Sequence, residues 1–121
     1  MFTRKTLLRR LAAIIAIGLS SGFAGSAGAA THAGSGTVYA MIVNDSSWGA
    51  DADYVMLNGV TSLGTCATQN GFVLLFLKDD AKGQRQYAML LAAKTAATAV
   101  TVDADDTYLN SQGYCYLRHV Y

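Results

Sequence analysis

The stretch TCATQNGFVLLFLKDD, residues 65–80, places a cysteine just ahead of an unbroken run of apolar side chains. The run is Phe72–Leu77, preceded by Gly71 and followed by charged residues, and Cys66 lies six positions before it. A short apolar run without polar–apolar alternation, bounded by turn formers, predicts a strand that is covered on both faces. We therefore expect a strand in the middle of a sheet or barrel wall.

The period of the sequence changes directly after this run. Asp79 or Asp80 can cap a helix N-terminus, because a side-chain oxygen there accepts from free backbone N–H groups and its charge suits the helix dipole. The following residues are rich in strong helix formers, which predicts a helix over Ala81–Ala97. The middle of this helix, Tyr87–Ala93, is apolar all round, which predicts burial on more than one side.

Four other segments are rich in β-branched and aromatic residues and are bounded by turn formers, so they are predicted strands: Gly36–Val43, Asp53–Asn58, Ala99–Asp103 and Gly113–Tyr121. Residues 104–113 are predicted to be a polar loop, with a strand extension around Thr107–Leu109. The resulting order is β-β-β-α-β-β, in a mainly β, small α+β class. A five-stranded barrel with this order follows the plan of an OB-fold. The alternative is a five-stranded antiparallel sheet with one helix on a single face.

The N-terminal segment, residues 1–29, has the composition of a secretory signal peptide. It has a basic start, a short apolar stretch at Leu11–Leu19, and small residues ending in Ala27-Gly28-Ala29. The apolar stretch is shorter than the roughly 20 residues that span a bilayer, so we expect no stable membrane span; an uncleaved N-terminal anchor is the alternative. We predict a signal peptide over 1–29, a flexible N-terminus over 30–35, a single OB-fold-like domain over 36–121, and a secreted or periplasmic protein.

Removal of residues 1–29 changes the charge balance. Four of the nine basic residues lie in that segment, and the five that remain face eight Asp, which leaves a net charge of −3. A nucleic-acid-binding domain normally carries a basic patch, and a peripheral membrane protein a polybasic one. The sequence therefore argues against a nucleic-acid partner.

Cys66 and Cys115 are the only two cysteines of the chain. An exported chain enters an oxidising compartment, and a domain of about 90 residues gains much from a covalent link. A disulfide between them is the economical interpretation; two buried thiols are the alternative. Two cysteines this far apart, with only His32 and His119 available, give no metal-ligand spacing.

No catalytic arrangement is recognisable. The cluster Asp103, Asp105 and Asp106 lacks the spacing of an EF-hand calcium loop, and nothing marks Asp45, Asp51 or Asp53 as a glycosidase acid pair. His119 has no nucleophile motif to serve and is interpreted as a structural strand residue. We expect no enzyme activity, no metal and no cofactor.

The loop NDSSWGADA, residues 44–52, is the most suggestive feature for binding. It holds the only Trp, and an indole beside short polar side chains suits a sugar ring. OB-folds bind oligosaccharides through the face of strands 2–3 and the loops after strands 1 and 4. The alternative is that the indole folds back onto the core. We predict a ligand site in these two loops at Asn44, Asp45, Ser47, Trp48, Tyr108 and Asn110.

The order GTV strand, cysteine, KGQRQYAMLLAA helix, AVTV strand and cysteine in the last strand resembles a family of small secreted bacterial proteins. That family is similar in layout to the OB-fold B subunits of A–B toxins of the subtilase cytotoxin and pertussis toxin groups. The resemblance covers Gly36–Tyr121 and implies a disulfide-bonded OB-fold, a ring of five copies whose helices line a pore, and recognition of sialylated or related glycans. No glycan-contacting residue of the toxins matches a position here.

Together these features predict an exported, non-enzymatic binding domain with a glycan or protein partner. The alternative is a structural or protein-interaction module of the bacterial envelope or secretome that has no carbohydrate ligand. The oligomeric state separates the two, because the resemblance implies a homo-pentamer.

Overall fold

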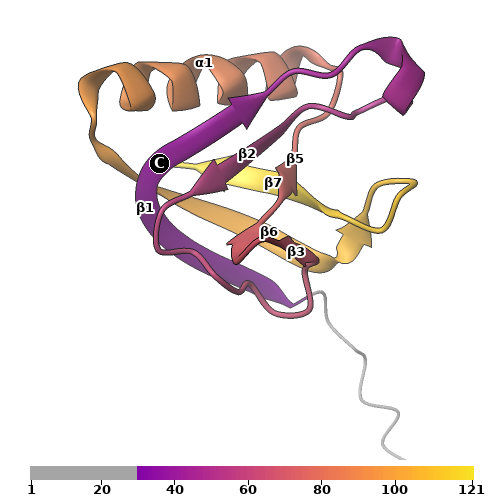
Figure 1. The fold of residues 1–121 in the computed structure, drawn as a ribbon, viewed down its shortest axis with the longest axis horizontal. Coiled ribbons are helices and arrows are strands. Elements are labelled where there is room, and N and C mark those ends of the chain that lie inside the picture. The colour runs from indigo at the N-terminus through magenta and orange to yellow at the C-terminus, as the bar shows by residue number, and fades with distance from the viewer. Residues whose placement is uncertain (1–29) are drawn as a thin grey trace, which may run out of the picture.

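The computed structural model describes residues 30–121, and the predicted signal peptide lies outside this range. The described chain is mainly β, with one α-helix and one short 3₁₀ helix (Figure 1). Its elements, in chain order, are β1 (Thr31–Ile42), η1 (Ser46–Trp48), β2 (Tyr54–Leu57), β3 (Thr68–Gln69), β4 (Phe72–Val73), β5 (Leu75–Phe76), α1 (Ala81–Ala96), β6 (Ala99–Leu109) and β7 (Cys115–Val120).

Five strands form a closed barrel in the order β1-β2-β5-β7-β6, and β3 and β4 form a separate two-stranded sheet. The barrel closes because the first half of β1 pairs with β6 while its second half pairs with β2. All barrel pairs are antiparallel except β5 with β7, where Phe76 lies opposite Tyr116. Each strand thus has one face toward the interior and one toward the outside.

The apolar run 72–77 is covered on both faces, as the sequence predicts. Val73 through Leu77 are all buried. Leu75 and Leu77 belong to the main core, whereas Leu74 and Phe76 join Tyr116 in a second cluster. The expected single strand is interrupted, because Phe72–Val73 pair with β3 as β4 and Leu75–Phe76 pair with β2 and β7 as β5.

The helix α1 begins as predicted at Asp80, whose side chain accepts from the Gly83 N–H at 2.7 Å. It lies along one end of the barrel (Figure 1). Its Leu90 is fully buried and belongs to the main core. Its buried residues, Gly83, Gln86, Leu90 and Ala93, form a single face. The expectation of burial on more than one side is wrong for the single chain, since Met89 and Leu91 on the flanks are 49% and 46% exposed.

Residues 31–35 are part of β1, where the sequence predicted a flexible start. They pair with residues 101–105 of β6, and the His32 ring lies 3.1 Å from the Asp106 carboxylate. Likewise β6 runs unbroken through the acidic residues that were predicted to lie in a polar loop. The two corrections share one cause, because β1 and β6 extend each other by pairing.

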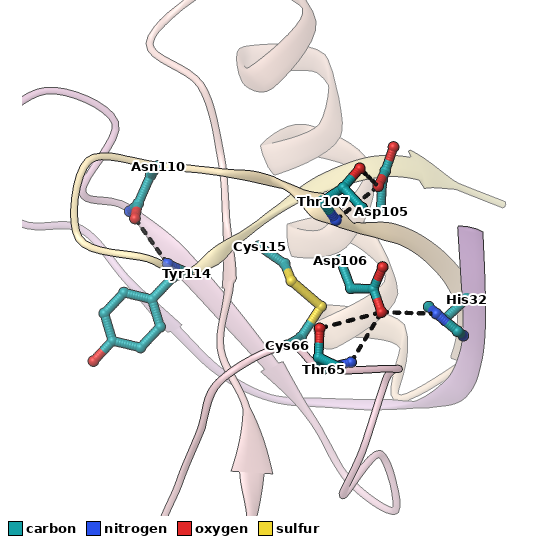
Figure 2. The surroundings of a disulfide bond; sticks show 9 residues. All are labelled: His32, Thr65, Cys66, Asp105, Asp106, Thr107, Asn110, Tyr114 and Cys115. Atoms are coloured by element: carbon teal, nitrogen blue, oxygen red, sulfur yellow. Dashed lines mark hydrogen bonds and ion pairs between the residues drawn. A yellow bond between two sulfur atoms is a disulfide. The ribbon is translucent and has the colours of Figure 1, made fainter. Parts of the chain in front are cut away.

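The predicted disulfide is present between Cys66 and Cys115, whose Cα atoms are 5.5 Å apart (Figure 2). It joins the loop before β3 to the first residue of β7. Next to Cys66, the Thr65 N–H donates to the Asp106 carboxylate at 3.0 Å. The same Asp106 oxygen lies beside His32, so one carboxylate connects the start of β1, the Cys66 loop and β6 (Figure 2).

Within residues 30–121, no helix combines the length and the apolar character needed to cross a membrane.

Candidate functional site

A hollow of about 380 Å³ opens on the outer face of the barrel beside η1. Four aromatic side chains and three side-chain amides line it: Trp48, Tyr54, Phe76 and Tyr114, with Asn44, Gln69 and Gln112. We call this the Trp48 hollow. Its volume lies within the range of small-molecule sites, which combine aromatic and apolar side chains with polar groups that orient the ligand.

Strand alternation places the aromatic wall of the Trp48 hollow. Tyr54 on β2 and Phe76 on β5 point outward because their neighbours Val55 and Leu75 point into the main core. The rings of Tyr54 and Phe76 are 5.1 Å apart, and those of Phe76 and Tyr114 are 4.8 Å apart and stacked. The wall is therefore a continuous aromatic surface across three neighbouring segments.

The other walls come from two loops. Asn44 and Trp48 belong to the loop between β1 and β2, and Gln112 and Tyr114 belong to the loop between β6 and β7. The Asn44 side-chain amide donates to the Ala52 carbonyl at 2.7 Å, which closes the base of the first loop. The Gln112 side-chain amide donates to the Trp48 carbonyl at 3.0 Å and joins the two loops. Side-chain amides that bind backbone carbonyls thus fix the two loops that form the hollow.

Trp48 does not fold back onto the core. Its residue is 62% exposed at the rim of the hollow, with the indole available on the surface. Among residues 30–121, no side-chain hydrogen bond is found for Gln69 or for the hydroxyl groups of Tyr54 and Tyr114. The Trp48 hollow therefore presents aromatic faces next to polar groups that have no partner in the described chain.

Of the six ligand residues predicted from sequence, the structure brings Asn44 and Trp48 together. Asp45 accepts from the Ser47 backbone N–H at 2.9 Å and from the Ser47 hydroxyl, and these bonds lower the pKa of Asp45. Both side chains are exposed, and neither lines the Trp48 hollow. Their contacts shape η1, which in turn holds Trp48.

Asn110 and Tyr108 lie elsewhere. Asn110 is 8% exposed, and its side-chain oxygen accepts from the N–H groups of Gln112 and Tyr114, each at 3.0 Å. It shapes the loop between β6 and β7 from within (Figure 2). Tyr108 stacks at an angle against Tyr116, with ring centres 5.0 Å apart, and lines a different hollow.

Sequence reasoning missed Tyr54, Gln69, Phe76, Gln112 and Tyr114 as lining residues. A signal for one of them, Tyr114, existed, since alternation in the last strand puts it with Tyr116 on the face opposite Cys115 and Leu117. Nothing in the sequence indicated that Gln69 lines the hollow, because its position depends on the β3–β4 hairpin turning back toward β2.

A second hollow, of about 460 Å³, lies where the N-terminus of α1 meets β6 and β7. Three cations line it: Lys78, Lys82 and Arg118. The ammonium group of Lys78 lies 4.7 Å from the centre of the Tyr108 ring and 5.0 Å from that of Tyr116. The hydroxyl group of Tyr108 beside it raises the pKa of Lys78. We call this the Lys78 hollow.

The carboxylate of Asp105 at the floor of the Lys78 hollow already has its partners. One oxygen accepts from the Thr107 hydroxyl at 2.6 Å and from the Thr107 N–H at 2.9 Å, and the other accepts from Arg118 at 3.0 Å. The Thr107 contacts, and then the Arg118 charge, lower the pKa of Asp105. Asp105 is therefore a buried structural anion.

Among residues 30–121, no group of three His, Cys, Asp or Glu side chains is placed to hold a metal ion. No family model, no curated protein and no solved structure matches the chain. The Trp48 hollow and the Lys78 hollow are thus the observations from which function is argued.

Proposed function

We propose that this chain is an exported OB-fold domain that binds a glycan in the Trp48 hollow and catalyses no reaction. The order of the strands supports the fold assignment. The first three barrel strands in the sequence, β1, β2 and β5, lie next to one another, and the fourth, β6, returns to pair with β1. That is a Greek-key arrangement in a five-stranded barrel, and α1 separates its third and fourth strands, as the OB-fold plan requires.

The observation that carries the glycan proposal is the position and lining of the Trp48 hollow. It lies over the second and third barrel strands, between the loops that follow the first and fourth, which is the surface OB-folds use for oligosaccharides. Its four aromatic rings suit the apolar faces of sugar rings. Its three amides and two tyrosine hydroxyl groups suit the hydroxyl groups of sugars.

Export to an oxidising compartment is supported by the disulfide, because such bonds are uncommon in reducing cellular spaces. It is also supported by the signal-like composition of residues 1–29. A secreted or periplasmic binding domain would meet glycans on a cell surface or in the envelope.

A glycan array with the purified protein tests the proposal, followed by titration of any hit against Trp48→Ala. The matched control is Tyr121→Ala, which removes an exposed aromatic residue that does not line the hollow. We expect Trp48→Ala to weaken binding at least about tenfold with little change in melting temperature, and Tyr121→Ala to bind normally. An array without hits, or equal binding by both variants, contradicts the proposal.

A protein-interaction module is the second candidate, favoured by the outer surface of α1. Met89 and Leu91 are half-exposed. Ala88 and Ala92, which lie between them on the surface of the helix, are exposed as well. In the ring of five copies implied by the toxin resemblance, the helices line the pore, so this surface would lie inside the assembly. Light scattering separates the two candidates, because a pentamer that dissociates in a Leu91→Asp variant favours the toxin-like glycan-binding domain, whereas a monomer at high concentration favours an interaction module whose α1 surface is free for another protein.

A further inference from the structure

We propose that the Lys78 hollow is a second binding site, for a small organic acid that carries one carboxylate. The site is separate from the Trp48 hollow, and the two have no lining residue in common. The proposal therefore stands without the glycan proposal.

The first argument is the concentration of positive charge. Residues 30–121 contain five basic side chains and eight acidic ones, yet three of the five basic side chains line this single hollow. A domain with an excess of Asp has no general reason to collect its cations in one concavity. An anion approaching the protein would be attracted there, because the three cations outnumber the two carboxylates of the hollow and leave it with a positive charge in a protein that is otherwise acidic.

The second argument is that the acids in the hollow are already engaged, whereas the cations keep free donors. Asp80 caps α1, and Asp105 is saturated by Thr107 and Arg118. For Lys82, no hydrogen bond or ion pair with another residue of the described chain is found. Arg118 donates to Asp105 through one terminal nitrogen. A guanidinium has five N–H donors and this side chain is 41% exposed, so Arg118 keeps donors for a ligand.

The third argument is the fixed position of Lys78. Contact with the faces of Tyr108 and Tyr116 restrains the ammonium group of Lys78. The ammonium group of a free surface lysine has no such restraint. Gln86 restrains the other side of the hollow, because its side-chain amide donates to the carbonyls of Leu117 and Arg118 at 3.3 and 2.9 Å. Lys78 and the strand segment that carries Arg118 are thus restrained before any ligand arrives.

Charge balance selects the ligand class. Three cations and two carboxylates leave a formal charge of +1 in the hollow, which matches one carboxylate better than a phosphate dianion. A volume of about 460 Å³ accommodates a molecule larger than a simple ion. The exposed ring of Tyr108 and the Thr107 side chain offer contacts to its uncharged body.

The test is a ¹H–¹⁵N NMR titration of the purified protein with benzoate and, separately, with benzamide, which has nearly the same shape without the charge. We expect benzoate to shift the backbone amides of Thr107, Tyr108 and Arg118 saturably, and benzamide to leave them in place. The indole N–H of Trp48 reports on the other hollow and should not follow these shifts.

Variants assign the effect to the cations. Lys78→Gln combined with Lys82→Gln should weaken benzoate binding at least about tenfold. Lys82→Gln alone, at an exposed position that cannot disturb the fold, should weaken it about threefold. Arg85→Gln is the matched control, since Arg85 lies on the same helix but outside the hollow.

Three results would each overturn the proposal. They are the absence of a saturable shift with benzoate, equal shifts with benzamide, and equal losses for Lys82→Gln and Arg85→Gln. Failure of the glycan array would leave these measurements unaffected, so the two proposals fail separately.

Discussion

The side-chain amide of Gln112 donates a hydrogen bond of 3.0 Å to the backbone carbonyl of Trp48, 64 positions away in the sequence. This bond fixes the loop that carries Trp48 against the loop that carries Tyr114. A binding site whose walls are fixed before the ligand arrives loses less entropy on binding. The Gln112–Trp48 bond is therefore a positioning contact for the Trp48 hollow.

Replacing Gln112 tests that role. Gln112→Glu keeps the size of the side chain but places a carboxylate oxygen against the Trp48 carbonyl, so the bond is lost. We expect the ¹⁵N relaxation order parameter of the Trp48 backbone amide to fall while the melting temperature changes by no more than about 2 °C, because the bond is exposed. Gln84→Glu, an exposed helix position, is the control. An unchanged order parameter would show that the loops are held by other contacts.

The disulfide should supply a large share of the stability. It closes a segment with a sequence separation of 49, which corresponds to about 4 kcal/mol on the chain-entropy estimate. We expect Cys66→Ala combined with Cys115→Ala to lower the free energy of unfolding by about 2–5 kcal/mol in urea titrations. The wild-type protein should lose the same amount when reduced. Equal stability of oxidised and reduced protein would contradict this, and would show that the barrel holds without its link.

The features that the sequence predicted correctly depend on local patterns. The unbroken run 72–77 indicated burial on both faces, and Asp80 before a series of helix formers indicated the start of α1. Two cysteines behind a predicted signal peptide indicated one disulfide. Each of these conclusions needs only neighbouring residues or a count. None requires knowledge of which strand lies next to which.

The features that it missed depend on strand register and on tertiary contacts. Asp105 and Asp106 look like loop residues, but Thr107, Arg118, Thr65 and His32 satisfy their carboxylates and let β6 continue. The choice between Asn110 and Gln112 as a site residue depends on how the loop between β6 and β7 turns. Composition alone cannot distinguish a side chain that turns inward from one two positions later that turns outward.

Gly83 should not tolerate a side chain, although it lies in a helix. A Cβ at this position would lie 1.8 Å from the backbone oxygen of Lys78, so α1 or the preceding chain would have to move. At an exposed helix position, Gly→Ala stabilises by about 1 kcal/mol. Here we expect Gly83→Ala to lower the free energy of unfolding by about 1–3 kcal/mol in urea titrations.

The exposed position Ala88 of the same helix provides the reverse control for Gly83. Ala88→Gly should cost about 0.5–1 kcal/mol from backbone entropy alone, without displacing any neighbour. A Gly83→Ala variant as stable as the wild type, beside the expected loss for Ala88→Gly, would show that α1 can move away from Lys78 at little cost.

Tyr116 should make the protein sensitive to alkali. Burial, and then the hydrogen bond of 2.8 Å that its hydroxyl group donates to Asp51, raise the pKa of Tyr116 to about 12. Below pH 10 the residue is protonated in both the folded and the unfolded chain, so its contribution to stability is fully present. Between pH 10 and 12 the unfolded chain releases the proton first, so the free energy of unfolding declines as the pH rises.

The size of this decline is on the order of 1–3 kcal/mol, and urea titrations between pH 8 and 12 measure it. Tyr116→Phe should start from a lower stability at pH 8, because the bond to Asp51 is lost, and should then decline less steeply. Tyr39→Phe, which removes a hydroxyl group from a half-exposed residue, should keep the wild-type slope because Tyr116 remains. Parallel curves for the wild type and Tyr116→Phe would mean that burial and the Asp51 contact do not raise the pKa of the Tyr116 phenol in the folded protein.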